Sequence, residues 1–177
     1  MNLPDWLSPE RMTRHWIWAA PLSAIVIAID QITKSMVLAE PVFRALDCLS
    51  GGICGRIEIS TLFDLSMTWN RGVSFGAFQA EGLARWGLFA VTSVIALGFS
   101  IWLLGAARRL TALALCLVIG GAVGNLIDRA RFGAVVDFLD FSGMYFPWVF
   151  NVADASITVG AACLLLDQLL AGRDAKG

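Results

Sequence analysis

Three aspartates in one stretch of the chain, residues 125–158, have the type and spacing that could do chemistry. Asp128, Asp137 and Asp154 lie there between two strongly apolar runs. Two carboxylates that share a site cannot both ionise freely, so one proton is held between them. One carboxylate can then act as a base toward water while the other donates a proton to the substrate. This chemistry is typical of aspartic proteases and needs neither a metal nor a cofactor.

Each of these acids also has a simpler explanation. Asp128 has Arg129 beside it, so an ion pair between neighbours would account for it. Asp154 falls in the expected first turn of a helix, where the dipole favours a carboxylate and a capping role is equally open. Asp137 follows two valines and precedes a phenylalanine, an apolar frame that would bring it to the edge of a bilayer. Spacing alone does not decide whether Asp128 or Asp137 is the partner of Asp154.

Other catalytic chemistries lack a residue that they need. His15 is the only histidine, and it is expected at the opposite end of the molecule from the acids. A Ser-His-Asp triad is therefore not available at the acids, and a metal site there is unattractive. The net charge is −1, so no basic field suggests a nucleic acid partner.

The elements that must position the acids are membrane helices. The mean hydropathy is +0.72 and 15% of the residues are charged, which is far from the composition of an ordinary soluble domain. At about 20 residues per span, the chain has room for four helices plus loops in a single domain, residues 1–177. The apolar runs predict transmembrane helices at about 17–37, 83–104, 110–127 and 152–170, separated by longer segments at about 39–82 and 128–151.

Basic residues set the expected orientation. With four spans, three basic clusters fall on one side: Arg11 with Arg14, Arg108 with Arg109, and Arg173 with Lys176. By the positive-inside rule that side is the cytoplasm. Arg129 and Arg131 count against this orientation, although the acid-rich cluster around them could neutralise them. We therefore expect cytoplasmic termini, extracytoplasmic longer segments, and a first span that is retained rather than cleaved as a signal peptide.

The segment 39–82 carries a β-strand pattern. Between residues 57 and 69, apolar side chains (Ile57, Ile59, Phe63, Leu65, Met67 and Trp69) share one parity and the polar ones mostly take the other. This period-two alternation predicts strands with one apolar face, in a small sheet lying on the membrane. Cys48 and Cys54 lie close together in the same segment. A disulfide is plausible if the segment faces an oxidising compartment, and two free thiols are the alternative.

The first apolar run contains the block Asp30-Gln-Ile-Thr-Lys34. Asp30 and Lys34 are four residues apart, so they share a helix face and can pair. Such a pair either helps the helices associate or supports a polar site at the far end of the span.

These blocks together resemble lipoprotein signal peptidase, the type II signal peptidase of bacteria. The resemblance covers nearly the whole chain and rests on several blocks in order: Asp30-Gln-Ile-Thr-Lys34, Asn70-Arg-Gly-Val-Ser-Phe-Gly76, Gly124-Asn-Leu-Ile-Asp-Arg129 with Val135-Val-Asp-Phe138, and Phe150-Asn-Val-Ala-Asp-Ala-Ser156. It implies a membrane α-helical fold with four transmembrane helices, a small extracytoplasmic β-sheet element and an aspartic dyad.

Mapped residue by residue, the resemblance places the dyad on Asp137 and Asp154. Further residues match family positions that line or brace the site: Asp30, Lys34, Asn70, Arg71, Asn125, Asp128, Arg129 and Asn151. The segment 46–55, with its two cysteines, has no known family role.

The resemblance also implies a substrate, an inhibitor and a location. The substrate is a prolipoprotein whose cysteine carries diacylglycerol, cleaved just before that cysteine at the outer face of the bacterial inner membrane. The family is the target of the cyclic peptide antibiotic globomycin. A transporter or channel subunit would need polar residues through several helix centres, and a purely structural membrane protein gives no reason for acids in the blocks on both sides of one short loop.

Overall fold

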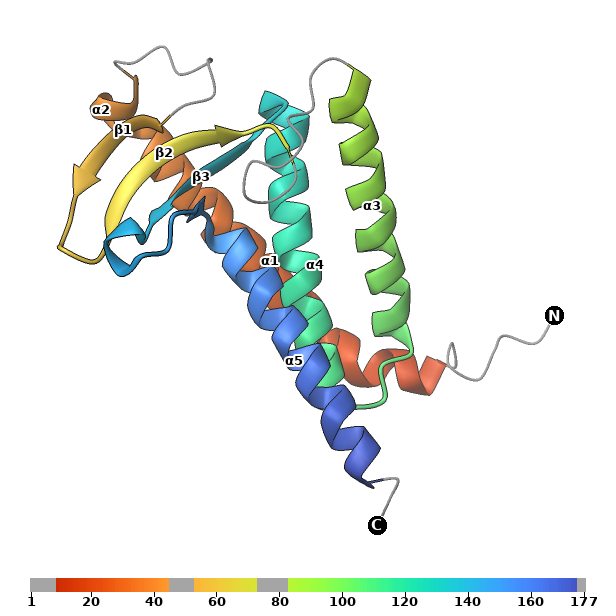
Figure 1. Ribbon diagram of the computed structural model, residues 1–177. Coiled ribbons are helices and arrows are strands. Elements are labelled where there is room, and N and C mark those ends of the chain that lie inside the picture. The colour runs from red at the N-terminus through yellow and green to blue at the C-terminus, as the bar shows by residue number, and fades with distance from the viewer. Residues whose placement is uncertain (1–8, 45–52, 73–82, 175–177) are drawn as a thin grey trace.

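The computed structural model describes residues 9–44, 53–72 and 83–174, and within them the chain forms a helical bundle with a sheet at one end (Figure 1). The long helices are α1 (Pro9–Ala39), α3 (Leu83–Leu104), α4 (Arg109–Phe132) and α5 (Val152–Asp174). Each contains a stretch long and apolar enough to cross a membrane. The predicted fold class, a four-helix membrane protein with a small sheet, is confirmed.

Helix α4 is the centre of the bundle. It packs against α1, α3 and α5, and it is the most buried of the four spans. Glycines allow this close approach, because a Cβ added at Gly120 would lie 2.8 Å from Val26 Cβ on α1. The outward faces of the other helices carry exposed apolar side chains such as Val94 on α3 and Leu165 on α5, which suits contact with lipid tails.

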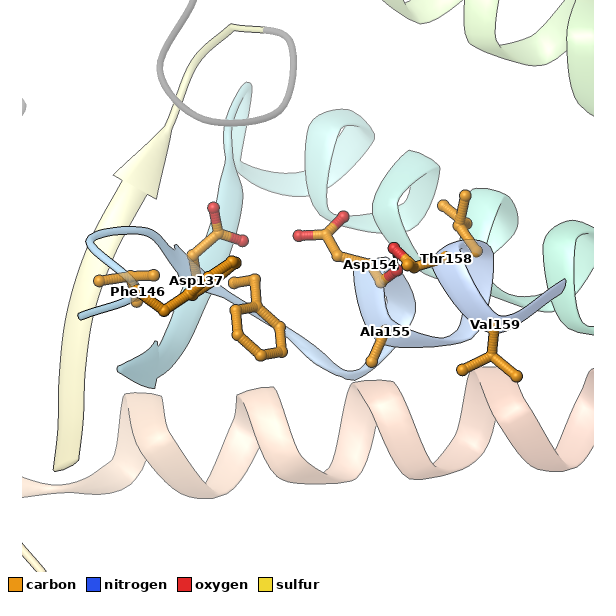
Figure 2. Close-up of a pocket in the computed structure, with 9 residues that line it drawn as sticks. Asp137, Phe146, Asp154, Ala155, Thr158 and Val159 are labelled. Atoms are coloured by element: carbon orange, nitrogen blue, oxygen red, sulfur yellow. Dashed lines mark hydrogen bonds between the residues drawn. The ribbon is translucent and has the colours of Figure 1, made fainter. Parts of the chain in front are cut away.

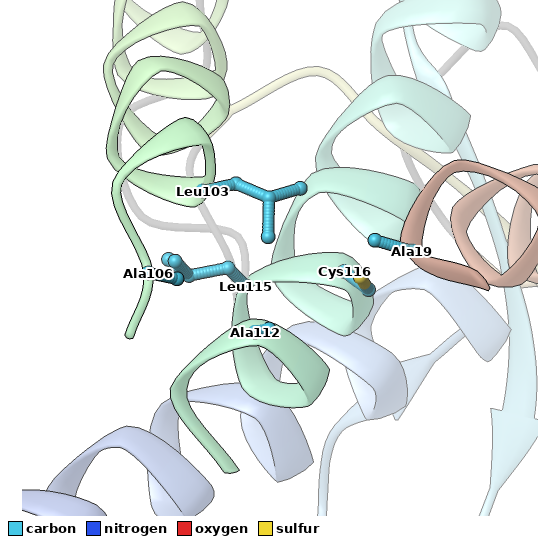
Figure 3. Packing of buried hydrophobic residues seen from close by; sticks show 6 residues of the cluster. All are labelled: Ala19, Leu103, Ala106, Ala112, Leu115 and Cys116. Carbon is cyan, nitrogen blue, oxygen red and sulfur yellow. The ribbon is translucent and has the colours of Figure 1, made fainter. Parts of the chain in front are cut away.

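The end of the bundle away from the sheet, called here the far end, has an apolar core. Figure 3 shows this cluster of side chains where α1, α3 and α4 meet. Its members are Ala19, Leu103, Ala106, Ala112, Leu115 and Cys116. All six are at most 6% exposed. Small residues dominate this cluster, so the helices come close together by van der Waals packing, as is usual for membrane helices.

The opposite end, called here the sheet end, carries four antiparallel strands in the order β1-β2-β3-β4. They are β1 (Ile53–Glu58), β2 (Asp64–Asn70), β3 (Val135–Asp140) and β4 (Val149–Phe150), with a short helix α2 (Pro41–Arg44) beside β1 and a 3₁₀ turn η4 (Ser142–Met144) after β3. The alternation between residues 57 and 69 therefore predicted β2, and it overlaps β1 at residues 57–58. It gave no sign that the segment after α4 supplies two more.

The apolar face of the sheet packs on the end of α1. Met67 is 2% exposed and joins a cluster with Val37 of α1, Phe43 of α2 and Phe138 of β3. Ile59 was expected on the same face, but it lies beyond the end of β1 and is 56% exposed.

The structure describes one of the two cysteines of the predicted bridge, Cys54. Cys54 is buried at 1% exposure and is disulfide-bonded. Cys48 lies outside the described residues, so the Cys48–Cys54 pairing stays a prediction.

Two short connections bring β3 and α5 to the same place. Helix α4 continues past the apolar run to Phe132 and is stopped by Gly133, whose φ of 71° is a left-handed conformation that glycine adopts without strain. Strand β3 starts two residues later, at Val135. After the β3–β4 hairpin, α5 begins at Val152, directly beyond the last strand. The chain thus leaves α4 at Phe132, forms the β3–β4 hairpin and returns to the sheet end of the bundle at Val152.

Candidate active site

Asp137 and Asp154 face each other at the sheet end. Asp137 is on β3 and Asp154 is in the first turn of α5, and their carboxylates point toward one another (Figure 2). Both residues line one cavity. The cavity has a volume of about 510 Å³, and most of its wall is apolar: Phe146, Val149, Phe150, Ala155, Ile157 and Val159. The site therefore combines two acids with an apolar chamber.

The carboxyl of Asp137 is 2% exposed and is held by two amides. Asn70 Nδ2 donates to one oxygen at 3.0 Å, and Asn151 Nδ2 donates to the other at 2.6 Å. Burial and the nearby Asp154 charge raise the pKa of Asp137 to about 7, although the two amides oppose the shift. This carboxyl can therefore take up or release a proton near neutral pH.

Asn151 explains both the start of α5 and the placement of Asp154. Its Oδ1 accepts a hydrogen bond from the backbone N–H of Asp154 at 2.8 Å, three residues along. This is the geometry of an N-cap, so the capping role once open to Asp154 belongs to Asn151. The Asp154 carboxylate instead accepts a hydrogen bond from Asn125 Nδ2 at 2.8 Å. Because the Asn151 amide also binds Asp137, one side chain fixes both acids.

Behind the two acids lies a buried ion network centred on Lys34. Its ammonium is 2.9 Å from Asp30, 2.9 Å from Asp128 and 3.0 Å from Asn125 Oδ1, so all three of its donors are used. The predicted pairing of Asp30 with Lys34 is confirmed. Lys34 also orients the Asn125 amide, whose nitrogen is thereby directed at Asp154.

Both oxygens of the Asp128 carboxylate are bonded within this network. Besides Lys34, the carboxylate accepts hydrogen bonds from Gln31 Nε2 at 2.9 Å and from the backbone N–H of Val136 at 3.2 Å. The simpler explanation of Asp128, an ion pair with the neighbouring Arg129, is therefore replaced by the contact with Lys34. A helix turn directs adjacent side chains to different faces, and Arg129 donates to the Gly72 carbonyl at 3.1 Å instead.

Asp30 reaches across to the start of α5. Its Oδ1 accepts the backbone N–H of Ala153 at 3.0 Å, one of the N–H groups that a helix start leaves unpaired. Gly124 of α4 makes room for this contact, because a Cβ there would lie 2.6 Å from Asp30 Oδ2. Asp30 is fully buried. It thus links α1, α4 and the turn that carries Asp154.

The Asn70-Arg71-Gly72 block enters the site from the end of β2. Asn70 Oδ1 accepts the backbone N–H of Gly72 at 3.0 Å, which turns its amide nitrogen toward Asp137. Arg71 is half-buried beside it. Residues 73–76 of the same motif lie outside the described residues.

The structure thus gathers most of the predicted site residues into one network. Asp30, Lys34, Asn125, Asp128 and Asn151 interlock behind the two acids, and Asn70 and Arg129 approach from the side. Sequence reasoning missed Gln31, which bonds Asp128 and the Gly124 carbonyl, and the aromatic wall of Phe146 and Phe150. Gln31 lies inside a recognised block, whereas no local pattern marks residues 146–150 as a cavity wall.

The arrangement is suited to acid–base hydrolysis. One group that titrates near neutral pH faces a second carboxylate, both are held by neutral amides, and an apolar chamber opens beside them. A cation bonded directly to either acid would hold it ionised, whereas an amide leaves a proton free to sit on either.

Comparisons with known proteins give the family of the chain. The family model for signal peptidase II matches residues 22–170. Lipoprotein signal peptidase of Caulobacter vibrioides is 40% identical over 90% of each chain, and that of Methylorubrum extorquens is 52% identical over 63% of this chain and 67% of its own. A solved bacterial membrane enzyme has the same fold, with a TM-score of 0.73 at 24% identity over 87% of this chain and 88% of its own. The chain belongs to the signal peptidase II family.

Proposed function

We propose that Asp137 and Asp154 are the catalytic dyad of this peptidase. Signal peptidase II is an aspartic-type peptidase that removes signal peptides from prolipoproteins, and this protein carries out that reaction. The observation that supports this dyad is the contrast among the three acids. Asp137 and Asp154 face one cavity and are bonded to neutral amides, whereas Asp128 is taken up by Lys34, Gln31 and a backbone N–H.

In the proposed reaction the dyad holds one proton. The ionised carboxylate removes a proton from a water molecule while the water oxygen attacks the scissile carbonyl carbon. The protonated carboxyl donates its proton to the carbonyl oxygen. The tetrahedral intermediate then collapses with cleavage of the C–N bond, and the amine leaves with the proton taken from water. The hydroxyl proton returns to the dyad, which restores its single proton.

We propose that Asn151 holds the two acids at a fixed distance during these steps. It bonds the Asp137 carboxyl and the Asp154 backbone, so the distance between the acids depends on one rigid amide. Asn125, held by Lys34, orients the Asp154 carboxylate. Asn70 and Arg129 flank the acids, and with Arg71 we assign them to substrate binding or support of the site.

The proposed substrate is a prolipoprotein whose cysteine carries diacylglycerol, cleaved just before that cysteine. The apolar chamber supports this choice, since Phe146, Phe150 and Val159 offer no partner to a polar peptide. Val159 is also 54% exposed on α5, so the chamber is continuous with the face that would contact lipid. A lipid-modified chain could therefore reach the dyad without leaving the bilayer.

The proposed location is the bacterial inner membrane, with the sheet end on the extracytoplasmic side. Helix α1 begins, and α5 ends, away from the sheet (Figure 1), which agrees with basic clusters on the cytoplasmic side. A globomycin-type inhibitor is expected to compete for the same chamber.

The experiment that tests the proposed substrate compares two precursors. Purified protein in lipid nanodiscs is given a prolipoprotein with and without the diacylglyceryl group, and the cleavage site is identified by mass spectrometry. We expect the modified precursor to be cut before its cysteine, with kcat/KM at least about 100-fold higher than for the unmodified one, since one acyl chain alone buries many methylenes. Equal cleavage of both precursors would contradict the lipid requirement.

A further inference from the structure

A further acid of the sheet end, Asp140, lies on the same strand as Asp137 but is not among the residues that line the cavity. It is 2% exposed. Arg56 Nη2 donates to its Oδ2 at 2.7 Å, Ser66 Oγ donates to the same oxygen at 2.6 Å, and the Ser142 backbone N–H donates to Oδ1 at 2.9 Å. Burial alone would raise the pKa of Asp140, but these hydrogen bonds outweigh it and hold the pKa below its ordinary value. Asp140 is therefore an ionised group with fixed partners.

The partners of Asp140 join three strands. Arg56 is on β1, and it also pairs with Asp64 at the start of β2 at 3.3 Å. Ser66 is on β2 and is fully buried. The cluster of Arg56, Ser66 and Asp140, called here the clasp, thus ties β1 and β2 to the strand that carries Asp137.

The clasp lies on an irregularity in the β2–β3 pairing. Leu65 is opposite Leu139, but Thr68 is opposite Asp137, so β2 has one more residue than β3 between these two pairs. This is a β-bulge, and Ser66 and Met67 are the residues within it. Met67 points into the apolar cluster under the sheet while the Ser66 hydroxyl bonds Asp140. Bulges bend a strand and re-aim its side chains, and they are common beside active sites.

The bulge sets the strand register that places Asn70 beside Asp137. Beyond it the register runs Thr68 to Asp137 and Asn70 to Val135, and in that register the Asn70 amide reaches the Asp137 carboxyl at 3.0 Å. A slip of one residue would turn every β2 side chain beyond the bulge to the opposite face of the sheet. Asn70 would then point away from Asp137.

We propose that the clasp of Arg56, Ser66 and Asp140 is a positioning device for catalysis, which holds the β2 bulge and thereby sets the Asn70–Asp137 contact. The inference rests on the proposed dyad. None of the three clasp residues lines the cavity beside Asp137 and Asp154, so they act through the strand register.

The far end of the bundle offers a matched control of the same composition. There Asp167 is 3% exposed, accepts a hydrogen bond from Thr111 Oγ1 at 2.5 Å and lies 3.0 Å from Arg108 Nε. An arginine, a buried aspartate and a hydroxyl thus occur at both ends. Only the sheet-end cluster touches a strand that carries a proposed catalytic acid.

The first arm of the test compares Asp140→Asn and Ser66→Ala with Asp167→Asn and Thr111→Ala. Steady-state cleavage of a diacylglyceryl prolipoprotein is measured in nanodiscs, and rates are normalised to folded protein. We expect kcat to fall about 10- to 100-fold for the sheet-end variants, because a displacement of about 1 Å at a reacting group costs that much, while KM changes less than about threefold. The far-end variants are expected to keep kcat within about twofold, since any loss there is one of stability. Ser66→Thr keeps a hydroxyl and should recover most of the rate.

The second arm asks whether the clasp acts through Asn70. If it does, Ser66→Ala and Asn70→Ala combined should lower kcat no further than the more severe of the two alone, because residues that act through one contact are not additive. Multiplicative effects would overturn the proposal, as would far-end variants that lose as much kcat as sheet-end ones. A rise in KM for Arg56→Gln with no change for Ser66→Ala would show instead that Arg56 binds substrate.

The outcomes separate this inference from the dyad itself. If Asp137→Asn retains activity, the dyad is wrong whatever the clasp does. If Asp137→Asn is inactive and Ser66→Ala matches wild type, the dyad stands and the clasp is only structural.

Discussion

Both ends of the bundle bury aspartates that contact cations, and the sheet end also buries two aspartates that are bonded to amides. At the far end, Asp167 has an arginine and a threonine as partners beside an apolar core (Figure 3). At the sheet end, the ammonium of Lys34 pairs with Asp30 and Asp128, while Asp137 and Asp154 are bonded to asparagine amides.

The comparison separates structural acids from reactive ones. A buried carboxylate with a cation in contact stays ionised and holds elements together. A buried carboxyl with neutral partners and a second acid nearby keeps its proton to a higher pH, as the raised pKa of Asp137 shows. The identity of the partner, rather than burial alone, therefore distinguishes the two roles in this protein.

The largest effect is expected where a sheet-end acid loses its cation. Lys34→Met would leave Asp30 and Asp128 buried without a compensating charge, at 0% and 1% exposure. We expect a loss of about 3–5 kcal/mol in stability, with loss of cleavage. Thermal unfolding in detergent micelles measures it. A variant as stable as wild type would mean that the two acids are protonated and that Lys34 is not their counter-ion.

A smaller loss of stability, together with a loss of activity, is expected from a substitution at the contact between α4 and α1. Gly124→Ala would place a Cβ 2.6 Å from Asp30 Oδ2, and that oxygen cannot move away because Lys34 holds it. We expect about 1–3 kcal/mol of destabilisation and at least tenfold lower kcat. Gly98→Ala on α3 is the control, since an added Cβ there meets nothing within 4 Å. Equal behaviour of the two variants would refute the role of Gly124.

The contribution of Asp137 to the stability of the protein should depend on pH. Because the pKa of Asp137 is raised from 3.8 to about 7, the folded protein binds more protons than the unfolded chain between these values. The free energy of unfolding should therefore fall as the pH rises through this window. Asn stays neutral, so Asp137→Asn should gain stability over wild type at about pH 8.5 and not at about pH 4. The measurement is the melting temperature of Asp137→Asn and of wild type at both pH values. A gain in stability of the same size at each pH would count against the raised pKa.

The smallest effect is expected at the far end. The side chain of Arg108 is 39% exposed, so solvent screens its ion pair with Asp167. Arg108→Gln should cost about 1 kcal/mol and leave kcat unchanged, because Thr111 still donates to the buried Asp167 and the glutamine amide can replace the arginine as a donor. A loss of catalysis in this variant, at full folding, would show that the two ends are not separable in the way described here.

Much of the fold could be predicted because its signals are local. Apolar runs mark the four helices, the alternation between residues 57 and 69 marks β2 and the end of β1, and the four-residue spacing of Asp30 and Lys34 predicts their pair. Each of these follows from neighbours in the sequence.

What could not be predicted depends on contacts between distant segments. The pairing of β3 with β2 brings Asn70 beside Asp137 across 67 residues, and Asp128 finds Lys34 rather than the adjacent Arg129. The link between Ser66 and Asp140 depends on a bulge that exists only once two strands have paired. Spacing along the chain left Asp128 and Asp137 equivalent, and their different partners distinguish them.

Cleavage of one diacylglyceryl prolipoprotein by wild type, Asp137→Asn, Asp154→Asn and Asp128→Asn tests the central claim most directly. Single-turnover rates in nanodiscs are compared, with the folded fraction of each variant measured in parallel. We expect folded Asp137→Asn and Asp154→Asn to lose about three to four orders of magnitude, as removal of an essential acid–base group does, while folded Asp128→Asn keeps measurable activity. Near wild-type cleavage by Asp137→Asn together with an inactive, folded Asp128→Asn would make Asp128 the partner of Asp154 and contradict the account.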